Sequence, residues 1–251
     1  MSALGSPRLH LRLTDSTNER ARELAAAGAP HGTLVSADEQ SAGRGRQGRR
    51  WSAPPGSALL MTLILRDPQR LLPLMAAVAA CEAAGSGALI KWPNDIVLEL
   101  PRGHGDPGAE RRPAPLGKLA GILAEGRPQE GWVVLGIGMN VAVRLRDLPA
   151  ELRDGGGPGL PAATLARASE DVEPMLESLL EALERWLAAP EEAVLAAWRA
   201  RDALVGREIS WGSGAGIAAG IDGEGRLVVA LAGGGQTALG AGEVHLAPLA
   251  D

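Results

Sequence analysis

A run of arginines and glycines between residues 43 and 50 is the part of the chain best suited to bind an anion. The segment reads GRGRQGRR, which places four guanidinium groups within seven residues on a backbone that three glycines make pliable. Arginine pairs bidentately with phosphate and carboxylate oxygens. The segment therefore predicts a deformable loop that wraps a polyanionic ligand.

Residues 43–48 also satisfy the dinucleotide pattern G-x-G-x-x-G, and Asp67 lies near the distance expected of a ribose-binding acid. A dinucleotide fold needs a helix directly after this pattern, but the available residues include Pro54, Pro55 and Gly56. We therefore reject a dinucleotide site. A solvated basic turn and an RGG-like nucleic-acid contact stay open as alternatives, although basic glycine-rich tracts that bind nucleic acid usually occur in repeats.

Several side chains outside this loop are suited to a ligand site, and each also has a purely structural reading. Ser16 fits an N-cap, in a capping box with Glu19. Lys118 opens an otherwise apolar run and could be a surface lysine. Trp51 could be core. The sequence PND at residues 93–95 could be only a tight turn.

Hydrophobic periodicity predicts the elements that would position these residues. The expected helices are one that starts near Ser16 and ends at Gly28, and others over residues 71–84, 174–187 and 191–204. The expected strands cover residues 8–13, 33–37, 57–65, 96–100, 118–125 and 132–141. From Gly206, short strands alternate with glycine-rich turns, which is typical of a small β-barrel. We expect an α/β (α+β) fold with a mixed sheet over residues 1–204 and a second, all-β domain over residues 205–251.

Composition narrows the class of protein. The 251 residues are 45% hydrophobic and contain neither Phe nor Tyr, so the core must be aliphatic and the six Trp are the only aromatic rings. A net charge of −5 argues against a surface that binds nucleic acid or anionic lipid throughout. One cysteine, no signal peptide and no long apolar run indicate a cytoplasmic protein with no membrane partner. The four His show no ligand spacing, so we expect no metal held by a protein cluster.

Five segments carry further motifs: DSTN (Asp15–Asn18), EQSAGRGRQGRRW (Glu39–Trp51), KWPND (Lys91–Asp95), KLAGILAE (Lys118–Glu125) and GIGMNV (Gly136–Val141). In their order and spacing, these segments together resemble biotin protein ligases. The resemblance extends to the C-terminal residues, which look like that family's SH3-like barrel. It implies a two-step ligase that converts biotin and MgATP to biotinyl-5′-AMP and pyrophosphate, then passes biotin to a lysine of a biotin carboxyl carrier protein.

The resemblance also implies roles for individual residues. Lys118 and Arg46 would be catalytic, touching the biotin carboxylate and the α-phosphate. The residues implied for biotin are Ser16, Thr17, Asn18, Gln40, Gly43, Arg44, Gly45, Arg46, Lys118 and Gly121. Those implied for ATP are Arg46, Arg49, Trp51, Asn94, Asp95, Lys118 and Asn140, with Asp95 a candidate for Mg²⁺. Trp51 would stack near adenine.

The same resemblance sets expectations about partners. The family forms homodimers, and some members carry an N-terminal DNA-binding domain. Here the first strand begins within ten residues of Met1, so we expect no DNA partner. The charged segment Pro101–Pro115 is longer than the turn expected there, and could be inert or contact the carrier. Two other functions stay open: lipoate or octanoate transfer on a related fold, and a non-catalytic biotin- or nucleotide-binding module.

Overall fold

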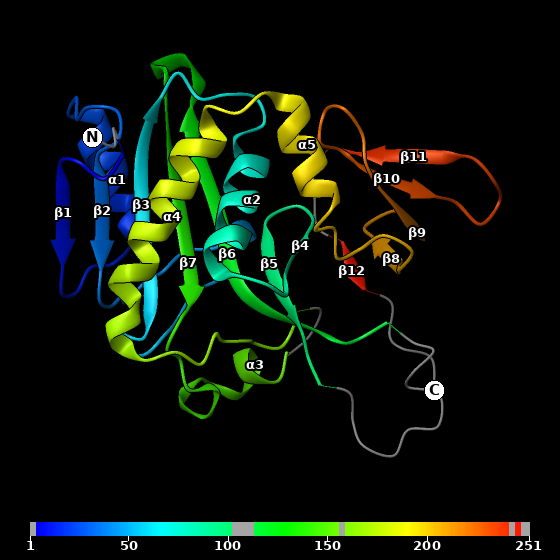
Figure 1. Cartoon of the computed structure of the whole chain (residues 1–251), viewed down its shortest axis with the longest axis horizontal. Helices are drawn as coiled ribbons and strands as arrows, with labels where there is room; N and C mark the ends of the chain where they lie inside the picture. Colours follow the sequence, from blue (N-terminus) through cyan, green and yellow to red (C-terminus); the bar gives the residue numbers. More distant parts are fainter. Residues whose placement is uncertain (1–3, 102–112, 156–158, 241–243, 247–251) are drawn as a thin grey trace.

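The computed structural model describes residues 4–101, 113–155, 159–240 and 244–246. Most of the charged segment Pro101–Pro115, and the loop expected there, lies outside the described residues. The described chain forms two sheets with helices packed on the larger one (Figure 1). The predicted mixed α/β class is confirmed.

The larger sheet has seven strands in the order β1-β2-β3-β7-β6-β5-β4. Their bounds are β1 Arg8–Leu11, β2 Leu34–Ala37, β3 Ala58–Arg66, β4 Ala88–Lys91, β5 Asp95–Glu99, β6 Leu116–Arg127 and β7 Trp132–Asn140. Strands β1 and β2 are parallel and the other neighbours are antiparallel, so the sheet is mixed. Strand β4 was not predicted, because its sequence ALIK does not alternate between apolar and polar residues.

Helices cover both faces of this sheet. Their bounds are α1 Thr17–Ala26, α2 Leu72–Ala84, α3 Ala150–Arg153, α4 Val172–Leu187 and α5 Glu191–Arg199. Successive strand residues point to opposite faces, so Val35, Ile64 and Val134 pack with α1. The alternate strand residues point to the other face of the sheet, where Leu63 and Leu135 pack with α2 and α4 in the main core. The core is aliphatic, as the composition predicts.

The smaller sheet is antiparallel, with strand order β11-β10-β9-β8-β12. Its strands are β8 Glu208–Trp211, β9 Gly214–Ile221, β10 Leu227–Ala230, β11 Gln236–Leu239 and β12 His245–Leu246. The described strands make an open sheet, and the closure expected of an SH3-like barrel is not confirmed. The predicted all-β character of this region is confirmed.

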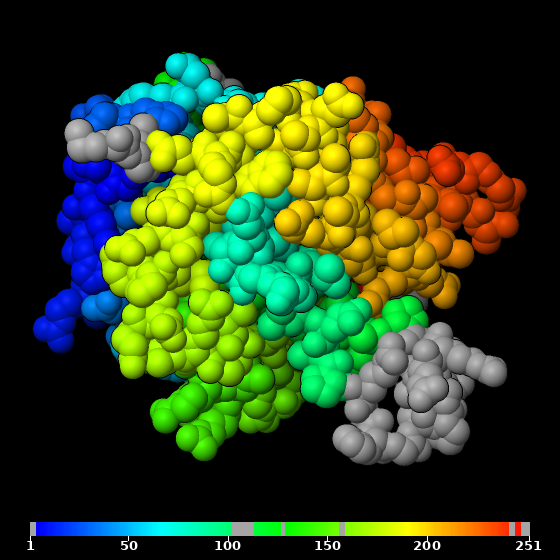
Figure 2. All heavy atoms as spheres, viewed as in Figure 1, coloured from blue at the N-terminus to red at the C-terminus, as the bar shows by residue number. Residues whose placement is uncertain are grey.

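The two sheets share one apolar core and several polar contacts. Leu204, Ile209, Leu227 and Val229 belong to the same buried cluster as the residues of α2 and α4. In the space-filling view, α4 and α5 (yellow) form a continuous surface with the smaller sheet (orange to red) (Figure 2).

The chain between α5 and β8 differs from the sequence prediction. A single helix was expected over residues 191–204, but α5 ends at Arg199. Residues 201–203 instead lie beside β4: Ile90 N–H donates to the Arg201 carbonyl (2.7 Å) and Ala203 N–H to the Ile90 carbonyl (2.9 Å). These backbone hydrogen bonds cover the edge of β4, an interaction between distant segments that local periodicity does not encode. Among the described residues, no helix is long and apolar enough to span a bilayer.

Candidate functional site

A cavity of about 280 Å³ lies on the face of the larger sheet that carries α1. Its walls come from the N-terminus of α1, the arginine loop, the turn between β4 and β5, strands β6 and β7, and residues within 148–152 and 159–162. Fourteen of the fifteen site residues named from the sequence line it. The exception is Gly43, the first residue of the arginine loop.

The arginine loop is closed by its own backbone. Trp51 N–H donates to the Gly43 carbonyl (3.0 Å) and Gly45 N–H to the Arg49 carbonyl (2.7 Å). A Cβ on Gly43 would lie 2.4 Å from the Trp51 carbonyl oxygen, so a side chain at this position would push the two ends of the loop apart. The loop ends in a short 3₁₀ turn, Arg46–Gly48, and no α-helix follows it. The structure thus agrees with rejecting a dinucleotide fold.

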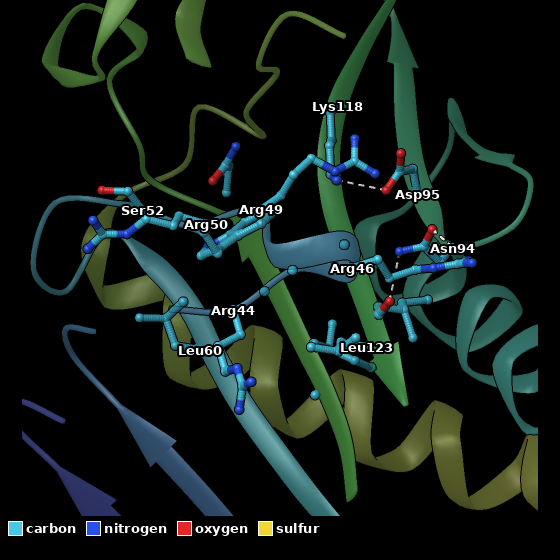
Figure 3. Close-up of a pocket in the computed structure, with 18 of the residues that line it drawn as sticks. Arg44, Arg46, Arg49, Arg50, Ser52, Leu60, Asn94, Asp95, Lys118 and Leu123 are labelled. Carbon is cyan, nitrogen blue, oxygen red and sulfur yellow. Dashed lines mark hydrogen bonds and ion pairs between the residues drawn. The ribbon is translucent and has the colours of Figure 1, made fainter. Parts of the chain in front are cut away.

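The guanidinium groups of the loop contact different walls of the cavity. Arg44 donates to Glu19 of α1 (2.9 Å), and Arg46 donates to Asn94 Oδ1 (3.4 Å). Figure 3 shows Arg46 and Arg49 on the side of the cavity where Asn94, Asp95 and Lys118 lie. The loop therefore brings positive charge to the β4–β5 turn.

Lys118 lies at the centre of this charged wall. Its Nζ is 2.7 Å from Asp95 Oδ1, and the Lys118 and Asp95 side chains are 27% and 10% exposed (Figure 3). The strand backbone around Lys118 is also held, because Lys118 N–H donates to the Pro161 carbonyl (2.7 Å) and Ala163 N–H to the Lys118 carbonyl (2.8 Å). An ion pair at this depth holds the amine in one place within the cavity.

The ring of Trp51 lies against two paired glycines of the sheet. Gly121 of β6 and Gly138 of β7 are opposite each other in register. A Cβ on Gly138 would lie 2.7 Å from Trp51 Cε2, and one on Gly121 would lie 3.3 Å from Trp51 Cζ3. Lys118 Nζ lies 5.9 Å from the centre of the Trp51 ring, within the range of a cation–π contact. A side chain at Gly138 would overlap the ring in this orientation, and one at Gly121 would make a tight contact with it.

The first turn of α1 forms the opposite end of the cavity. Ser16 is the N-cap residue but makes no side-chain capping hydrogen bond, so the predicted capping box is wrong. Gln40 takes that role, because its Oε1 accepts from the Thr17 N–H (2.7 Å) and the Thr17 hydroxyl (3.1 Å). Asp15 accepts from the Ser16 N–H (2.7 Å), and its hydrogen bonds from Arg20 hold the pKa of this exposed carboxyl well below its usual range.

The side-chain amides of two predicted ligand residues form hydrogen bonds with other parts of the protein. The Asn18 amide donates to Glu125 Oε2 (3.0 Å) and accepts from the Thr62 hydroxyl (2.7 Å). The Asn140 amide donates to the Ala163 carbonyl (2.9 Å), and the Leu165 N–H donates to the Asn140 carbonyl (3.0 Å). Both residues line the cavity, and both also fix its walls.

Sequence reasoning missed the wall made by residues within 148–152 and 159–162. It contributes Leu148, Glu151, Leu152, Leu160 and Ala162 to the lining. Glu151 and Leu152 lie in the four-residue helix α3, which is too short for helical periodicity to reveal, and no motif marks the other residues. The basic residues of the lining are Arg44, Arg46, Arg49, Arg50, Lys91 and Lys118, against only Asp95 and Glu151 as acids. The cavity is thus positively charged at one end and suited to a polyanion.

The chain matches known proteins over these same segments. A family model described as the biotin/lipoate A/B protein ligase family matches residues 10–141. A biotin--[acetyl-CoA-carboxylase] ligase of Paracoccus denitrificans is 35% identical over 242 residues, covering 87% of this chain and 92% of that protein. The chain belongs to the biotin/lipoate A/B protein ligase family.

Two further relatives of this ligase family define how far the similarity extends. The bifunctional ligase/repressor BirA of Bacillus subtilis is 40% identical over 163 residues, which are 60% of this chain but 45% of that protein. The chain thus spans about half the length of that relative. The biotin protein ligase from Aquifex aeolicus, solved in complex with biotin and ATP, has a TM-score of 0.74 and 24% identity, covering 96% of this chain and 99% of that one. This likeness shows the fold.

Proposed function

We propose that the protein is an ATP-dependent biotin protein ligase. It would activate biotin as biotinyl-5′-AMP and transfer the biotinyl group to a lysine of a biotin carboxyl carrier protein. The observation that carries this proposal is the joining, in one cavity, of an arginine- and lysine-rich end with an uncharged polar end built by Ser16, Thr17 and Gln40. A ligand with a polar ring at one end and a carboxylate at the other fits that division.

The first step brings two anions together. A carboxylate oxygen of biotin attacks the α-phosphorus of ATP, a C–O–P anhydride forms, and pyrophosphate leaves. Arg46 and Lys118 would neutralise the carboxylate and the α-phosphate, since both side chains reach the same wall of the cavity. Binding of the carboxylate would draw Lys118 from Asp95, its partner at 2.7 Å. Arg49 would bind the outer phosphates.

The second step releases AMP. The neutral amine of the carrier lysine attacks the acyl carbon of the anhydride, an amide forms as the nitrogen loses a proton to water, and the phosphate oxygen leaves with its charge on AMP. Trp51 and Asn140 would hold the adenosine end meanwhile, because both line the cavity beside Gly138. A ring held flat against the sheet is a suitable surface for a planar base.

Magnesium would enter with ATP. Asp95 offers a carboxylate and Asn94 a neighbouring amide oxygen, and Mg²⁺ prefers oxygen ligands. Within the described ranges, no group of three His, Cys, Asp or Glu side chains could hold a metal ion. Phosphate and water would therefore supply most of the ligands. The ion would neutralise phosphate charge when bound.

The domain boundaries, the carrier, the cellular location and the oligomeric state belong to the same proposal. We place the catalytic domain at residues 1–204 and an SH3-like domain at residues 205–251. The carrier would belong to acetyl-CoA carboxylase or a related carboxylase, and the ligase would act in the cytoplasm as a homodimer. DNA is not proposed as a partner.

Pyrophosphate release on mixing the protein with ATP and biotin tests the first step. Transfer of labelled biotin to a purified carrier domain, with and without ATP, tests the second. Transfer that needs ATP is the expected result. Biotin binding with no pyrophosphate would instead identify a non-catalytic binding module.

The lipoate or octanoate alternative is tested in the same assay. Octanoate and lipoate replace biotin at equal concentration, and pyrophosphate is measured again. The proposal expects biotin to be the preferred acid by a wide margin. A preference for either fatty acid would overturn it.

A further inference from the structure

The buried side chain of Thr62 lies beneath the ring end of the cavity without lining it. Thr62 is on β3 and is 0% exposed. Its hydroxyl donates to Asn18 Oδ1 (2.7 Å) and lies 2.9 Å from Thr17 Oγ1. Thr17 in turn donates to Gln40. One buried hydroxyl therefore contacts two consecutive residues in the first turn of α1.

Asn18 crosses three neighbouring strands in a single row. Thr62 of β3 is in register with Gly136 of β7, and Gly136 with Leu123 of β6. The Asn18 amide accepts from Thr62 at one end of this row. At the other end it donates to the Leu123 carbonyl (3.4 Å) and to Glu125 Oε2 (3.0 Å). The side chain thus fixes the position of α1 on the sheet.

Gly136 leaves the space that Asn18 occupies. A Cβ on Gly136 would lie 2.0 Å from Asn18 Oδ1, so the amide rests directly on the strand backbone. The next row on the same face of the sheet contains Leu60, Gly138 and Gly121, which line the cavity. A small shift of Asn18 would therefore move the ring end of the cavity relative to this floor.

We propose that Thr62 is a positioning residue for the ring of the substrate, acting through Asn18 and Thr17, and that Glu125 supports Asn18 from the other side. This inference rests on the proposed function, because biotin is the ligand whose ring is positioned. Neither Thr62 nor Glu125 lines the cavity, so neither is assigned a contact with substrate.

The test compares Thr62→Val, which keeps the shape of the side chain and removes the hydroxyl, with Thr62→Ser, which keeps the hydroxyl. Loss of the Thr62 hydroxyl as a donor to the buried amide oxygen of Asn18 should raise the KM for biotin roughly tenfold. The KM for ATP should stay within about twofold, and Thr62→Ser should restore most of the affinity for biotin. Dissociation constants for biotin, measured by tryptophan fluorescence or calorimetry, give the same comparison without catalysis.

Thr33→Val is the matched control, because Thr33 is also buried and its hydroxyl donates to the Pro30 carbonyl (2.8 Å) without lining the cavity. It should lower the melting temperature as Thr62→Val does and leave the KM for biotin unchanged. Glu125→Ala provides a second variant, at a side chain that is 28% exposed, should Thr62→Val fold poorly. It should also raise the KM for biotin, and its effect should combine less than additively with that of Thr62→Val.

The outcomes separate the two proposals. Wild-type protein that does not bind biotin would refute the proposed function. Wild-type protein that binds biotin, with Thr62→Val and Glu125→Ala binding it equally well, would refute only the positioning role. A loss of thermal stability with unchanged affinity would identify Thr62 as a purely structural residue and overturn the inference.

Discussion

Replacement of Gly138 by alanine tests whether the position of the Trp51 ring is set by the absence of a side chain on β7. The new Cβ would lie 2.7 Å from Trp51 Cε2 and 3.0 Å from both Cδ2 and Nε1. Ordinary carbon–carbon contacts begin near 3.4 Å. The ring must therefore move by about 0.7 Å or the strand must yield, and overpacking of this kind costs about 1–3 kcal/mol.

Thermal unfolding followed by circular dichroism measures this cost. For a chain of this size, each kcal/mol lowers the melting temperature by about 2–4 °C, so a fall of roughly 2–12 °C is expected. The KM for ATP should rise as well, because Trp51 is the side chain proposed to hold the adenine ring, and the substitution would displace it. Tryptophan fluorescence should also change, since the six Trp are the only strongly emitting side chains.

Gly212→Ala is the matched control, because a Cβ there would meet nothing within 4 Å. It should melt within about 1 °C of wild type, since surface substitutions usually change stability by less than about 0.5 kcal/mol. If Gly138→Ala also melted at the wild-type temperature and retained its affinity for ATP, the close packing of Trp51 on the sheet would not be a constraint on the site.

Three further predictions concern charge. Lys118→Met should lower pyrophosphate release about 100- to 1000-fold, the usual effect of removing a group that stabilises developing charge, and it should also lower the melting temperature because it leaves the buried Asp95 without its ion-pair partner; equal activity would remove Lys118 from the mechanism. Arg46→Gly should still form some adenylate but release it, labelling lysines of unrelated proteins, and retention as tight as in wild type would contradict its role. Burial raises the pKa of Asp202 to about 6. The folded state therefore binds more protons than the unfolded state between about pH 4 and 6. The free energy of unfolding should fall as the pH rises through that window, by about 3 kcal/mol in total. Asp202→Asn should remove that slope in denaturant titrations, and an unchanged slope would assign it to other groups.

The sequence was sufficient to predict the main strands and nearly all of the proposed site residues. Apolar runs such as residues 57–65 and 132–141 indicated buried strands because they contain few polar residues. The motifs around Arg46, Asn94 and Lys118 carry the resemblance to biotin protein ligases, and that resemblance implied their roles. Both features are local, so they could be recognised without knowing which segments meet.

The features that could not be predicted depend on contacts between distant segments. Gln40 caps α1 in place of Ser16 because the chain brings β2 and the start of α1 together, which no local pattern records. Residues 201–203 form no helix because the free edge of β4 offers them hydrogen bonds. The residues of the lining within 148–152 and 159–162 reach the cavity through their place in the fold, and no sequence motif marks them.

The pairing of residues 201–203 with β4 has a practical consequence for expression of this protein. A fragment that stops after α5 would leave the edge of β4 open and expose the apolar surface that Leu204, Ile209 and Leu227 cover. Open edges beside exposed apolar surface favour aggregation. The smaller sheet thus covers apolar surface of the larger one, and a minimal catalytic fragment should include it to stay soluble.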